Sequence, residues 1–359
     1  MVLSNVWNFF KNHQLLKEQN HTFLDLIPKQ LGASSVNQVR PISLCNIIYK
    51  IISKILATKF KSLLHLFISP YQSAFVPSRT IQDNTITAHE LFHTINSKRG
   101  RGGLMAIKID MEKPFDRMEW SFILAILSKL DFSPTWINWI RICITSPSFS
   151  ILINGSPYGL FNPKRGLRQG DPLSPFLFIL GSEALSRLLL RQESQGLLRG
   201  VRIARHCSPI SHLFFANDLI LFAKATFAEA TTLKSVVDQY CSWSGQAINI
   251  SKSSLPFSKN TPSSSIHSIS GIFQYKRMLS SSKYLGLPLS IGRSKTCAFQ
   301  DILEKVSGKI EGWRAKTLSQ AERFVLIRSV ASTIPSYAMS SFLLPISVAS
   351  SLDISFKIF

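Results

Sequence analysis

The chain has 359 residues, enough for about two or three domains and a substantial core. It carries 41 Lys and Arg against 20 Asp and Glu, a net charge of +21, while apolar residues make up 45%. This composition excludes a disordered basic tail. The charge predicts a polyanionic partner, either nucleic acid or an acidic membrane surface.

Membrane-spanning and secreted classes are also excluded. The longest uncharged stretch, 329–352, is serine-rich and interrupted by Pro335 and Pro345, so we expect no membrane span. The first thirty residues lack a signal-peptide pattern, since charged residues fall where an apolar core belongs. The five cysteines lie far apart without a C-x-x-C pair, which predicts reduced thiols in an intracellular protein of the cytoplasm or nucleus.

The first part of the chain predicts helices and one buried strand. Apolar residues recur at helical spacing over 47–67 with lysines between them, and a second helix is expected over 83–93. A short apolar strand over 104–109 ends at Asp110, and an apolar-faced helix follows from about residue 120.

Strands and helices also mix in the second part. A strand over 149–153 runs into the turn Asn154-Gly155, and Ser174 is expected to cap a helix that Pro175 begins. Two apolar runs within 212–222 predict a hairpin.

A further helix is expected near 233–243, followed by a serine-rich loop over 258–282. The C-terminal part is expected to be helical, with Ser319 and Glu322 spaced as a capping box. Because the order lacks a βαβα rhythm, the sequence predicts an α+β fold.

Three features could carry chemistry on a polyanion. Asp110 ends an apolar strand, residues 165–175 form a basic loop with glycines, and Phe215–Asp218 lies at a hairpin tip. Transfer of a phosphoryl group to a 3′-hydroxyl needs two divalent ions roughly 4 Å apart, held by carboxylates on rigid elements. A strand end and a hairpin tip can supply them, although each feature taken singly is also typical of an ordinary strand end or turn.

Eight segments in order carry a resemblance to a known family. They are RPISLCNIIYKIISK, QSAFVPSRTIQDN, KIDMEKPFDRMEW, NPKRGLRQGDPLSPFLF, SHLFFANDLILFAKA, SGQAINISKSS, KYLGLPL and GWRAKTLSQAERFVLIRSV. From about Phe9 onward the chain resembles the reverse transcriptase of plant non-LTR, LINE-type retrotransposons.

The resemblance implies a right-hand polymerase with an antiparallel palm sheet flanked by helices. The expected parts are fingers and a template-contacting segment over 1–103, a palm over 104–290 with a fingers-type insertion at about 130–165, and the start of a helical thumb over 291–359. Tyr284–Leu289 resembles the primer-gripping hairpin. The implied reaction copies an RNA template onto a DNA primer from dNTPs with Mg²⁺, or Mn²⁺ in its place.

The resemblance also implies roles for single residues. Asp110 and Asp218 match the metal-binding aspartates of the palm, and Phe115 matches the aromatic gate against a 2′-hydroxyl. Lys252 matches the lysine that protonates pyrophosphate. The residues expected to contact nucleotide or template are Phe115, Arg168, Gln169, Gly170, Lys29 and Arg40.

The departures from the family pattern predict weak or absent activity. The hairpin of the family has F/Y-A-D-D, whereas here Asn217 replaces the first aspartate and loses its charge, a change expected to cost orders of magnitude in rate. Ser78, Pro114 and Glu322 replace a usual glycine, alanine and glycine. With the upstream endonuclease of the family missing as well, we expect a truncated, decaying copy.

Two alternatives stay open. The first is a non-catalytic remnant that binds RNA or RNA–DNA hybrids through its basic surface. The second, more remote, is a zinc hydrolase, since His89-Glu90-Leu91-Phe92-His93 matches H-E-x-x-H. The third zinc ligand is the difficulty, because Glu112 lies at a suitable spacing but belongs to the segment after Asp110 that resembles the first palm motif.

Overall fold

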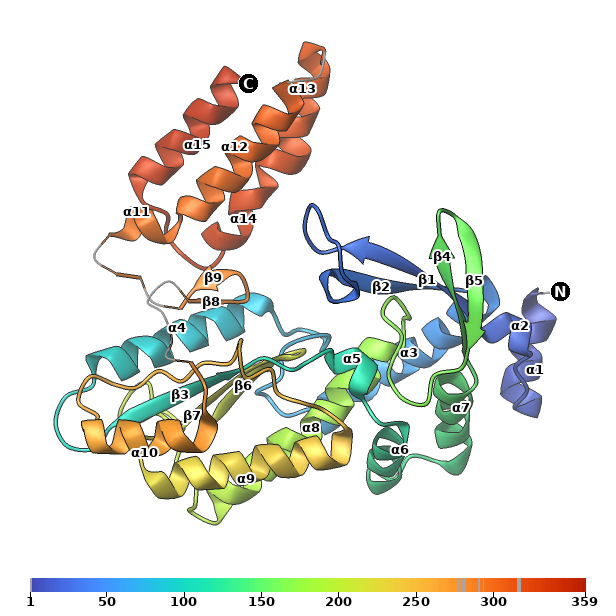
Figure 1. The fold of residues 1–359 in the computed structure, drawn as a ribbon, viewed down its shortest axis with the longest axis horizontal. Helices are drawn as coiled ribbons and strands as arrows, with labels where there is room; N and C mark the ends of the chain where they lie inside the picture. The colour runs from blue at the N-terminus through green and yellow to red at the C-terminus, as the bar shows by residue number, and fades with distance from the viewer. Residues whose placement is uncertain (1, 277, 279–281, 290, 293, 315–317) are drawn as a thin grey trace.

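The central sheet has three antiparallel strands in the order β3-β7-β6. They are β3 (Leu104–Ile109), β6 (His212–Phe215) and β7 (Asp218–Lys224), so the strand and the hairpin predicted from the sequence are confirmed. The computed structural model describes residues 2–276, 278, 282–289, 291–292, 294–314 and 318–359, with backbone alone at 313 and 314. Figure 1 shows the sheet between layers of helices.

Helices cover both faces of this sheet because its strands are apolar on both. One face packs on α6 (Trp120–Lys129), α8 (Ser174–Ser194) and α9 (Phe227–Ser244), and the other on α4 (Ile81–Ser97). Alternation assigns the side chains: Met105, Ile107, Leu219 and Leu221 face the first layer, and Ala106, Ile220 and Phe222 face α4.

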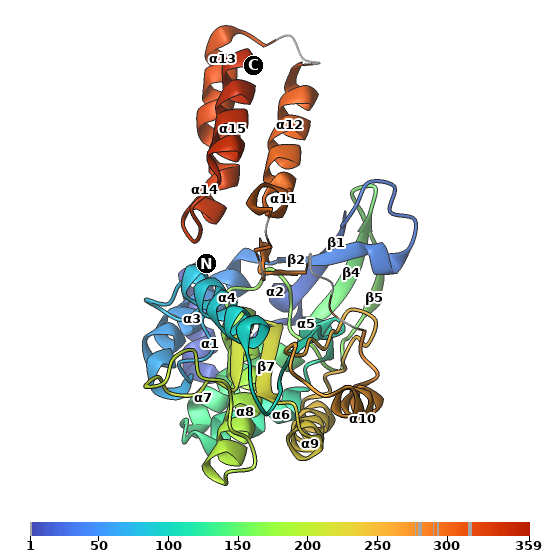
Figure 2. The ribbon, with the colours of Figure 1, turned by 90° about the vertical axis from the view of Figure 1, so that its left-hand side faces the viewer.

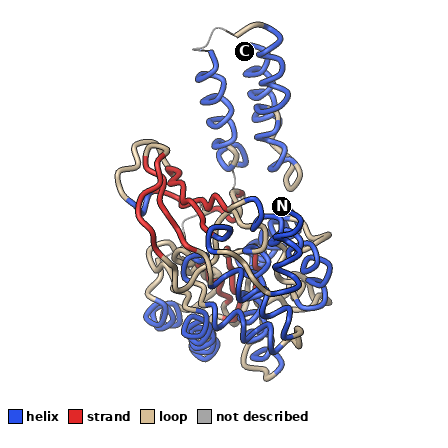
Figure 3. Tube along the Cα trace, turned by 90° about the vertical axis from the view of Figure 1, so that its right-hand side faces the viewer, coloured by secondary structure: helices blue, strands red, loops and turns tan. Residues whose placement is uncertain are grey.

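A second sheet of four strands was not expected from the sequence. Its order is β2-β1-β4-β5, with β1 (His21–Pro28), β2 (Val39–Cys45), β4 (Ser148–Ile153) and β5 (Ser156–Phe161). Strands β1 and β4 pair in parallel, which joins the N-terminal part to the region around residue 150. Figure 3 shows this sheet in red at one side of the molecule.

Further helices of this part of the chain pack on one another and on α6 and α8. They are α1 (Val2–Asn12), α2 (Lys17–Asn20), α3 (Ile47–Phe67), α5 (Pro114–Arg117) and α7 (Pro134–Thr145), with a 3₁₀ turn at Val36–Gln38. Helix α3 has the predicted bounds, and Asn46 caps it by accepting a hydrogen bond from the Ile48 amide.

The C-terminal part forms a helical unit with its own apolar cluster. A small hairpin of β8 (Lys283–Tyr284) and β9 (Leu287–Pro288) precedes it, and the predicted capping box of Ser319 and Glu322 is confirmed. Figure 2 shows these helices extending away from the central sheet. They are α11 (Lys295–Ala298), α12 (Gln300–Arg314), α13 (Gln320–Leu326), α14 (Thr333–Met339) and α15 (Ile346–Ile358), with a π-helical segment at Ile327–Ala331.

Two predictions of local structure were wrong. The expected loop over 258–282 contains α10 (Ser263–Phe273), which buries Ile269 and Phe273; residues 277 and 279–281 lie outside the described part. The expected cap Ser174 is the first residue of α8, and its hydroxyl donates to Asp171 at 2.9 Å instead of capping the helix. The α+β fold class is nevertheless confirmed. None of the described helices is long and apolar enough to cross a membrane.

Candidate active site

Asp110 and Asp218 lie opposite each other across two neighbouring strands. Ile109 on β3 pairs with Leu219 on β7, so the next pair outward is Asp110 and Asp218. Asp110 is fixed by its backbone, since its amide donates to the Ser253 hydroxyl at 3.2 Å and its carbonyl accepts from the Asn249 amide at 2.8 Å. The register therefore brings together two carboxylates that are more than a hundred positions apart in sequence.

The two carboxylates share a partly dehydrated site. Burial raises the pKa of Asp110, and the Lys252 and Lys108 ammonium groups oppose this. Burial also raises the pKa of Asp218, which Lys108 lowers and the neighbouring Asp110 charge raises further. Two like charges with little water favour a cation between them. A divalent ion, which prefers oxygen ligands, fits this pair.

Lys108 is a site residue that the sequence analysis missed. It lies two positions before Asp110 on β3, so both side chains share the face of the sheet toward α4. Its ammonium donates to the Lys283 carbonyl of β8 at 2.6 Å. The signal was available, because a lysine at that spacing in a strand must point to the same side as the aspartate.

The hairpin between the strands has a left-handed residue at its tip. Phe215 pairs with Asp218, leaving Ala216 and Asn217 as the turn. Ala216 has φ of 54°, a conformation that costs a non-glycine residue about 1–2 kcal/mol. Asn217 thus lies beside Asp218 in a constrained turn, where an amide provides an oxygen ligand without negative charge.

Helix α5 and the loop 165–170 lock Phe115 beside Gln169. The Leu167 amide donates to the Phe115 carbonyl at 2.7 Å, and Gln169 Nε2 donates to Asp116 Oδ1 at 3.4 Å. The Phe115 ring stacks on Phe178 with centroids 4.6 Å apart. These contacts fix the ring that the resemblance assigns to the sugar gate.

Gly170 allows the same loop to approach β2 closely. It has φ of 103°, and a Cβ there would lie 3.1 Å from the Ser43 carbonyl oxygen. Ser43 itself donates its amide to the Gln169 carbonyl at 2.7 Å. A larger residue would therefore push the loop away from the second sheet.

The structure corrects the expectation that Arg168 faces a polyanion. Its side chain is only 7% exposed, and the guanidinium lies 3.7 Å from the centre of the Tyr49 ring. It donates to Asn20 Oδ1 at 2.7 Å, to Thr22 Oγ1 at 3.2 Å and to the Cys143 carbonyl at 2.9 Å. These partners occupy the guanidinium inside the protein, so Arg168 joins the loop to α2, β1 and α7.

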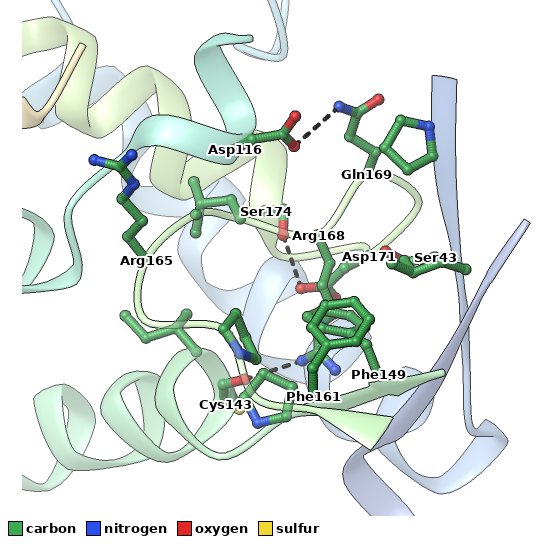
Figure 4. Close-up of a pocket in the computed structure, with 17 residues that line it drawn as sticks. Ser43, Asp116, Cys143, Phe149, Phe161, Arg165, Arg168, Gln169, Asp171 and Ser174 are labelled. Atoms are coloured by element: carbon green, nitrogen blue, oxygen red, sulfur yellow. Dashed lines mark hydrogen bonds between the residues drawn. The ribbon is translucent and has the colours of Figure 1, made fainter. Parts of the chain in front are cut away.

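A cavity of about 230 Å³ lies between this loop and the second sheet. Figure 4 shows Phe149 and Phe161 on one side of it and Asp116 with Gln169 on another. Arg168 and Asp171 also line it, but both are hydrogen-bonded within the protein. The cavity thus belongs to the same loop-to-sheet junction.

Arg40 lies on β2, and Lys29 directly follows the end of β1. Both are exposed, and Arg40 pairs with Ile27. The Lys29 ammonium donates to the Asn37 carbonyl at 3.0 Å. Burial raises the pKa of Asp116, while the Gln169 hydrogen bond and the charges of Lys113 and Lys29 lower it. Lys29 is therefore near the Phe115–Gln169 group.

The β8–β9 hairpin contacts the face of the sheet that carries Lys108. The Tyr284 ring is buried against α4, and Asn84 on that helix donates to the Tyr284 hydroxyl at 3.4 Å. Burial raises the pKa of Tyr284, and the nearby charge of Asp218 contributes. Tyr337 on α14 donates to the Leu285 carbonyl at 2.8 Å, which ties the hairpin to the C-terminal helices.

The histidines of H-E-x-x-H lie apart from this group. His89 packs edge-to-face on Phe342 with centroids 5.0 Å apart, and burial lowers its pKa. His93 is exposed on α4. Throughout the described residues no cluster of three or more His, Cys, Asp or Glu side chains could hold a metal ion, so the zinc hydrolase lacks a ligand set there.

Residues 27–289 match the family described as "Reverse transcriptase (RNA-dependent DNA polymerase)". The chain belongs to the reverse transcriptase family. This match contains both aspartates, the hairpin and the loop at 165–170. The resemblance to a retrotransposon reverse transcriptase is confirmed, and the mixed helices and antiparallel central sheet agree with the fold class it implied.

The relatives of this reverse transcriptase include transposon proteins. The "Transposon TX1 uncharacterized 149 kDa protein" of Xenopus laevis is 30% identical over 245 residues, covering 68% of this chain and 18% of that protein. The R2DM retrotransposable-element Pol polyprotein of Drosophila melanogaster is 29% identical over 226 residues, covering 63% of this chain and 20% of the relative. The chain thus spans about a fifth of these relatives.

Solved telomerase structures are also similar to this reverse transcriptase. Telomerase from Candida albicans, in complex with a fragment of telomeric RNA, has 10% sequence identity and a TM-score of 0.48, covering 99% of this chain and 62% of that one.

The predicted site residues of this reverse transcriptase fall into two groups and one exception. Asp110, Asp218, Asn217 and Lys252 lie around the ends of β3 and β7. Phe115, Gln169, Gly170, Lys29 and Arg40 lie around α5 and the second sheet, with Arg40 on β2. The exception is Arg168, whose guanidinium is internal.

Proposed function

We propose that the chain is the RNA-directed DNA polymerase domain of a LINE-type retrotransposon. The 3′-hydroxyl of a DNA primer attacks the α-phosphorus of a dNTP selected by an RNA template. One P–O bond forms to the primer, and one breaks to release pyrophosphate. The observation that carries this proposal is the register that places Asp110 opposite Asp218 at the edge of the sheet.

Asp110 and Asp218 would hold Mg²⁺, or Mn²⁺ in its place. Bound divalent ions would neutralise phosphate charge and favour the deprotonated primer hydroxyl. The raised pKa of each carboxylate supports the assignment, because a cation relieves both the repulsion and the lost hydration.

The other residues bind the nucleotide and move a proton. Phe115, held against Phe178, would exclude a 2′-hydroxyl, and the Gln169–Gly170 backbone would contact the base pair. Lys29 and Arg40 would meet the triphosphate. Lys252 would donate a proton to the leaving pyrophosphate, and its charge already lowers the pKa of Asp110.

The parts of the right hand follow from this placement. We assign fingers to 1–103, palm to 104–290 with its insertion at about 130–165, and thumb to 291–359. The parallel pairing of β1 with β4 supports this, because it joins the insertion to the N-terminal part. An RNA template and a DNA primer would be the partners, in the cytoplasm or nucleus.

Asn217 favours a second function for this particular chain. Without the first hairpin aspartate the site has one fewer negative charge to attract ions, so catalysis is expected to be strongly impaired. A protein that binds RNA or RNA–DNA hybrids without extending them would keep the fold and the net charge of +21.

Primer extension on poly(rA)/oligo(dT) tests the proposal. We expect Asn217→Asp to add dTMP with Mg²⁺ or Mn²⁺, and Asp110→Asn in that background to abolish addition. If Asn217→Asp binds the hybrid but adds no nucleotide, the polymerase assignment for this chain is wrong and the binding remnant is supported.

A further inference from the structure

A buried glutamine holds the backbone of the hairpin tip. Gln72 is 2% exposed, and its Oε1 accepts a hydrogen bond from the Ala216 amide at 3.1 Å. Its Nε2 donates to the Ala216 carbonyl at 3.5 Å. One carboxamide therefore binds both polar backbone groups of the residue just before Asn217.

Backbone hydrogen bonds hold the segment that carries Gln72 against β6. The segment around it runs beside β6: the Phe214 amide donates to the Tyr71 carbonyl at 2.8 Å, and the Ser73 amide donates to the Phe214 carbonyl at 3.2 Å. Oε1 also accepts from the Ala74 amide at 3.0 Å. The carboxamide is thus a rigid extension of the sheet edge.

The turn needs such support because Ala216 is left-handed. Its φ is 54°, and an alanine favours other backbone regions. Without Gln72 Oε1 its half-buried amide would also lose its hydrogen-bond partner in the protein. Asp218 follows two residues later, so a change in the turn would move its carboxylate relative to Asp110.

We propose that Gln72 is a positioning residue for polymerisation, which keeps the Ala216–Asn217 turn in the conformation that aligns Asp218 with Asp110. This inference rests on the proposed function for its catalytic consequence. Gln72 touches no substrate atom in this role. It acts through Ala216, from a segment 144 positions away in sequence.

Hydrogen exchange tests the positioning directly, without any activity. In Gln72→Met, which keeps the length but removes both hydrogen-bonding groups, the Ala216 amide should exchange at least about tenfold faster. The amide of Leu221 in the middle of β7 should keep its protection. Ser73→Ala is the matched control, because Ser73 lies in the same segment and its hydroxyl donates to Asn84 instead, at 2.9 Å. Equal protection of Ala216 in Gln72→Met and the parent would overturn the inference.

Kinetics in the Asn217→Asp background test the consequence. Gln72→Met should lower kcat about tenfold while the KM for dNTP stays within about threefold, because the turn positions a catalytic carboxylate without binding the nucleotide. Ser73→Ala should leave both constants unchanged. Adding Ala216→Gly, which tolerates the left-handed turn unaided, should restore most of the lost kcat. An unaltered kcat in Gln72→Met, or no recovery with Ala216→Gly, would contradict the inference.

Different results would refute the polymerase function and the positioning role of Gln72. An inactive Asn217→Asp protein with fast Ala216 exchange in Gln72→Met would refute the polymerase function and support the contact between Gln72 and the turn. An active Asn217→Asp protein that is indifferent to Gln72→Met would support the polymerase and refute the positioning role.

Discussion

Replacing Arg168 should destabilise the protein far more than replacing its neighbour Arg165. Arg168→Met keeps the apolar stem of the side chain but removes a buried guanidinium. That group makes three hydrogen bonds to Asn20, Thr22 and Cys143, and it lies 3.7 Å from the centre of the Tyr49 ring.

The expected loss of stability in Arg168→Met follows from the buried groups that lose the guanidinium. Asp171 is 4% exposed, and its carboxylate accepts from the Tyr49 hydroxyl at 3.0 Å and the Ser174 hydroxyl at 2.9 Å. Without Arg168 this buried carboxylate loses the guanidinium charge near it, and Asn20 Oδ1 and the Cys143 carbonyl lose a buried donor. Leaving a buried polar group without its hydrogen-bond partner typically costs about 1–3 kcal/mol, and more for charged groups, so we expect Arg168→Met to lose about 3–5 kcal/mol of free energy of unfolding.

Urea unfolding followed by tryptophan fluorescence measures this loss. Arg165→Met is the matched control, since Arg165 pairs with Glu119 at 3.3 Å on the surface and should contribute at most about 1 kcal/mol. Asp171→Asn added to Arg168→Met should recover part of the stability, because it removes the buried negative charge that the guanidinium no longer offsets. Equal, small losses in the two arginine variants would refute the internal role of Arg168.

Three further predictions concern the site. Because burial raises the pKa of Asp218, the folded state holds that proton more tightly than the unfolded chain, and stability falls as pH rises above the ordinary carboxyl range. Asp218→Asn should therefore raise the melting temperature by about 2 °C at pH 7 in the absence of metal. Near pH 3, where Asp218 is protonated in both states, the two proteins should have the same melting temperature. Equal melting temperatures at pH 7 would contradict this reasoning. Gly166→Ala should cost about 1–3 kcal/mol in urea unfolding, since its φ is 92° and its Cβ would lie 2.7 Å from the Asp116 carbonyl oxygen. Gly155→Ala, with φ of 81° and open space around it, should cost less, and the reverse order would be inconsistent with the packing. In the Asn217→Asp background, Phe115→Val should raise the rNTP-to-dNTP incorporation ratio at least about tenfold, and an unchanged ratio would exclude the gate role.

Local patterns predicted the elements whose signal lies within one segment. The helical spacing of apolar residues gave α3 its bounds, and the apolar run before Asp110 gave β3. The second sheet was not predicted because β1 pairs with β4, more than a hundred positions away, and β5 is exposed along its length. Helix α10 was missed because serine, which favours loops, fills its first turn, while burial of Ile269 and Phe273 stabilises it.

In the candidate site, too, the residues with a local signal could be predicted and those that depend on distant contacts could not. Asp110 and Asp218 could be named from sequence because a strand end and a hairpin tip are local features, and their register then follows from the sheet. Arg168 was misplaced because the basic residues Lys164 and Arg165, a few positions earlier, are exposed, whereas the partners of Arg168 come from distant elements. Gln72 begins one of the segments that carry the family resemblance, but its role could not be predicted from sequence, since it depends on a contact across 144 positions.

The single-turnover rate of dTMP addition to oligo(dT) on poly(rA) tests the central claim most directly, in the unaltered chain and in Asn217→Asp at saturating Mn²⁺. Restoring the missing carboxylate beside Asp218 should raise the rate by at least about a hundredfold, because the fold around Asp110 and Asp218 is already in place. Equal rates in the two proteins would contradict the account of this centre as a polymerase site that lacks one charge.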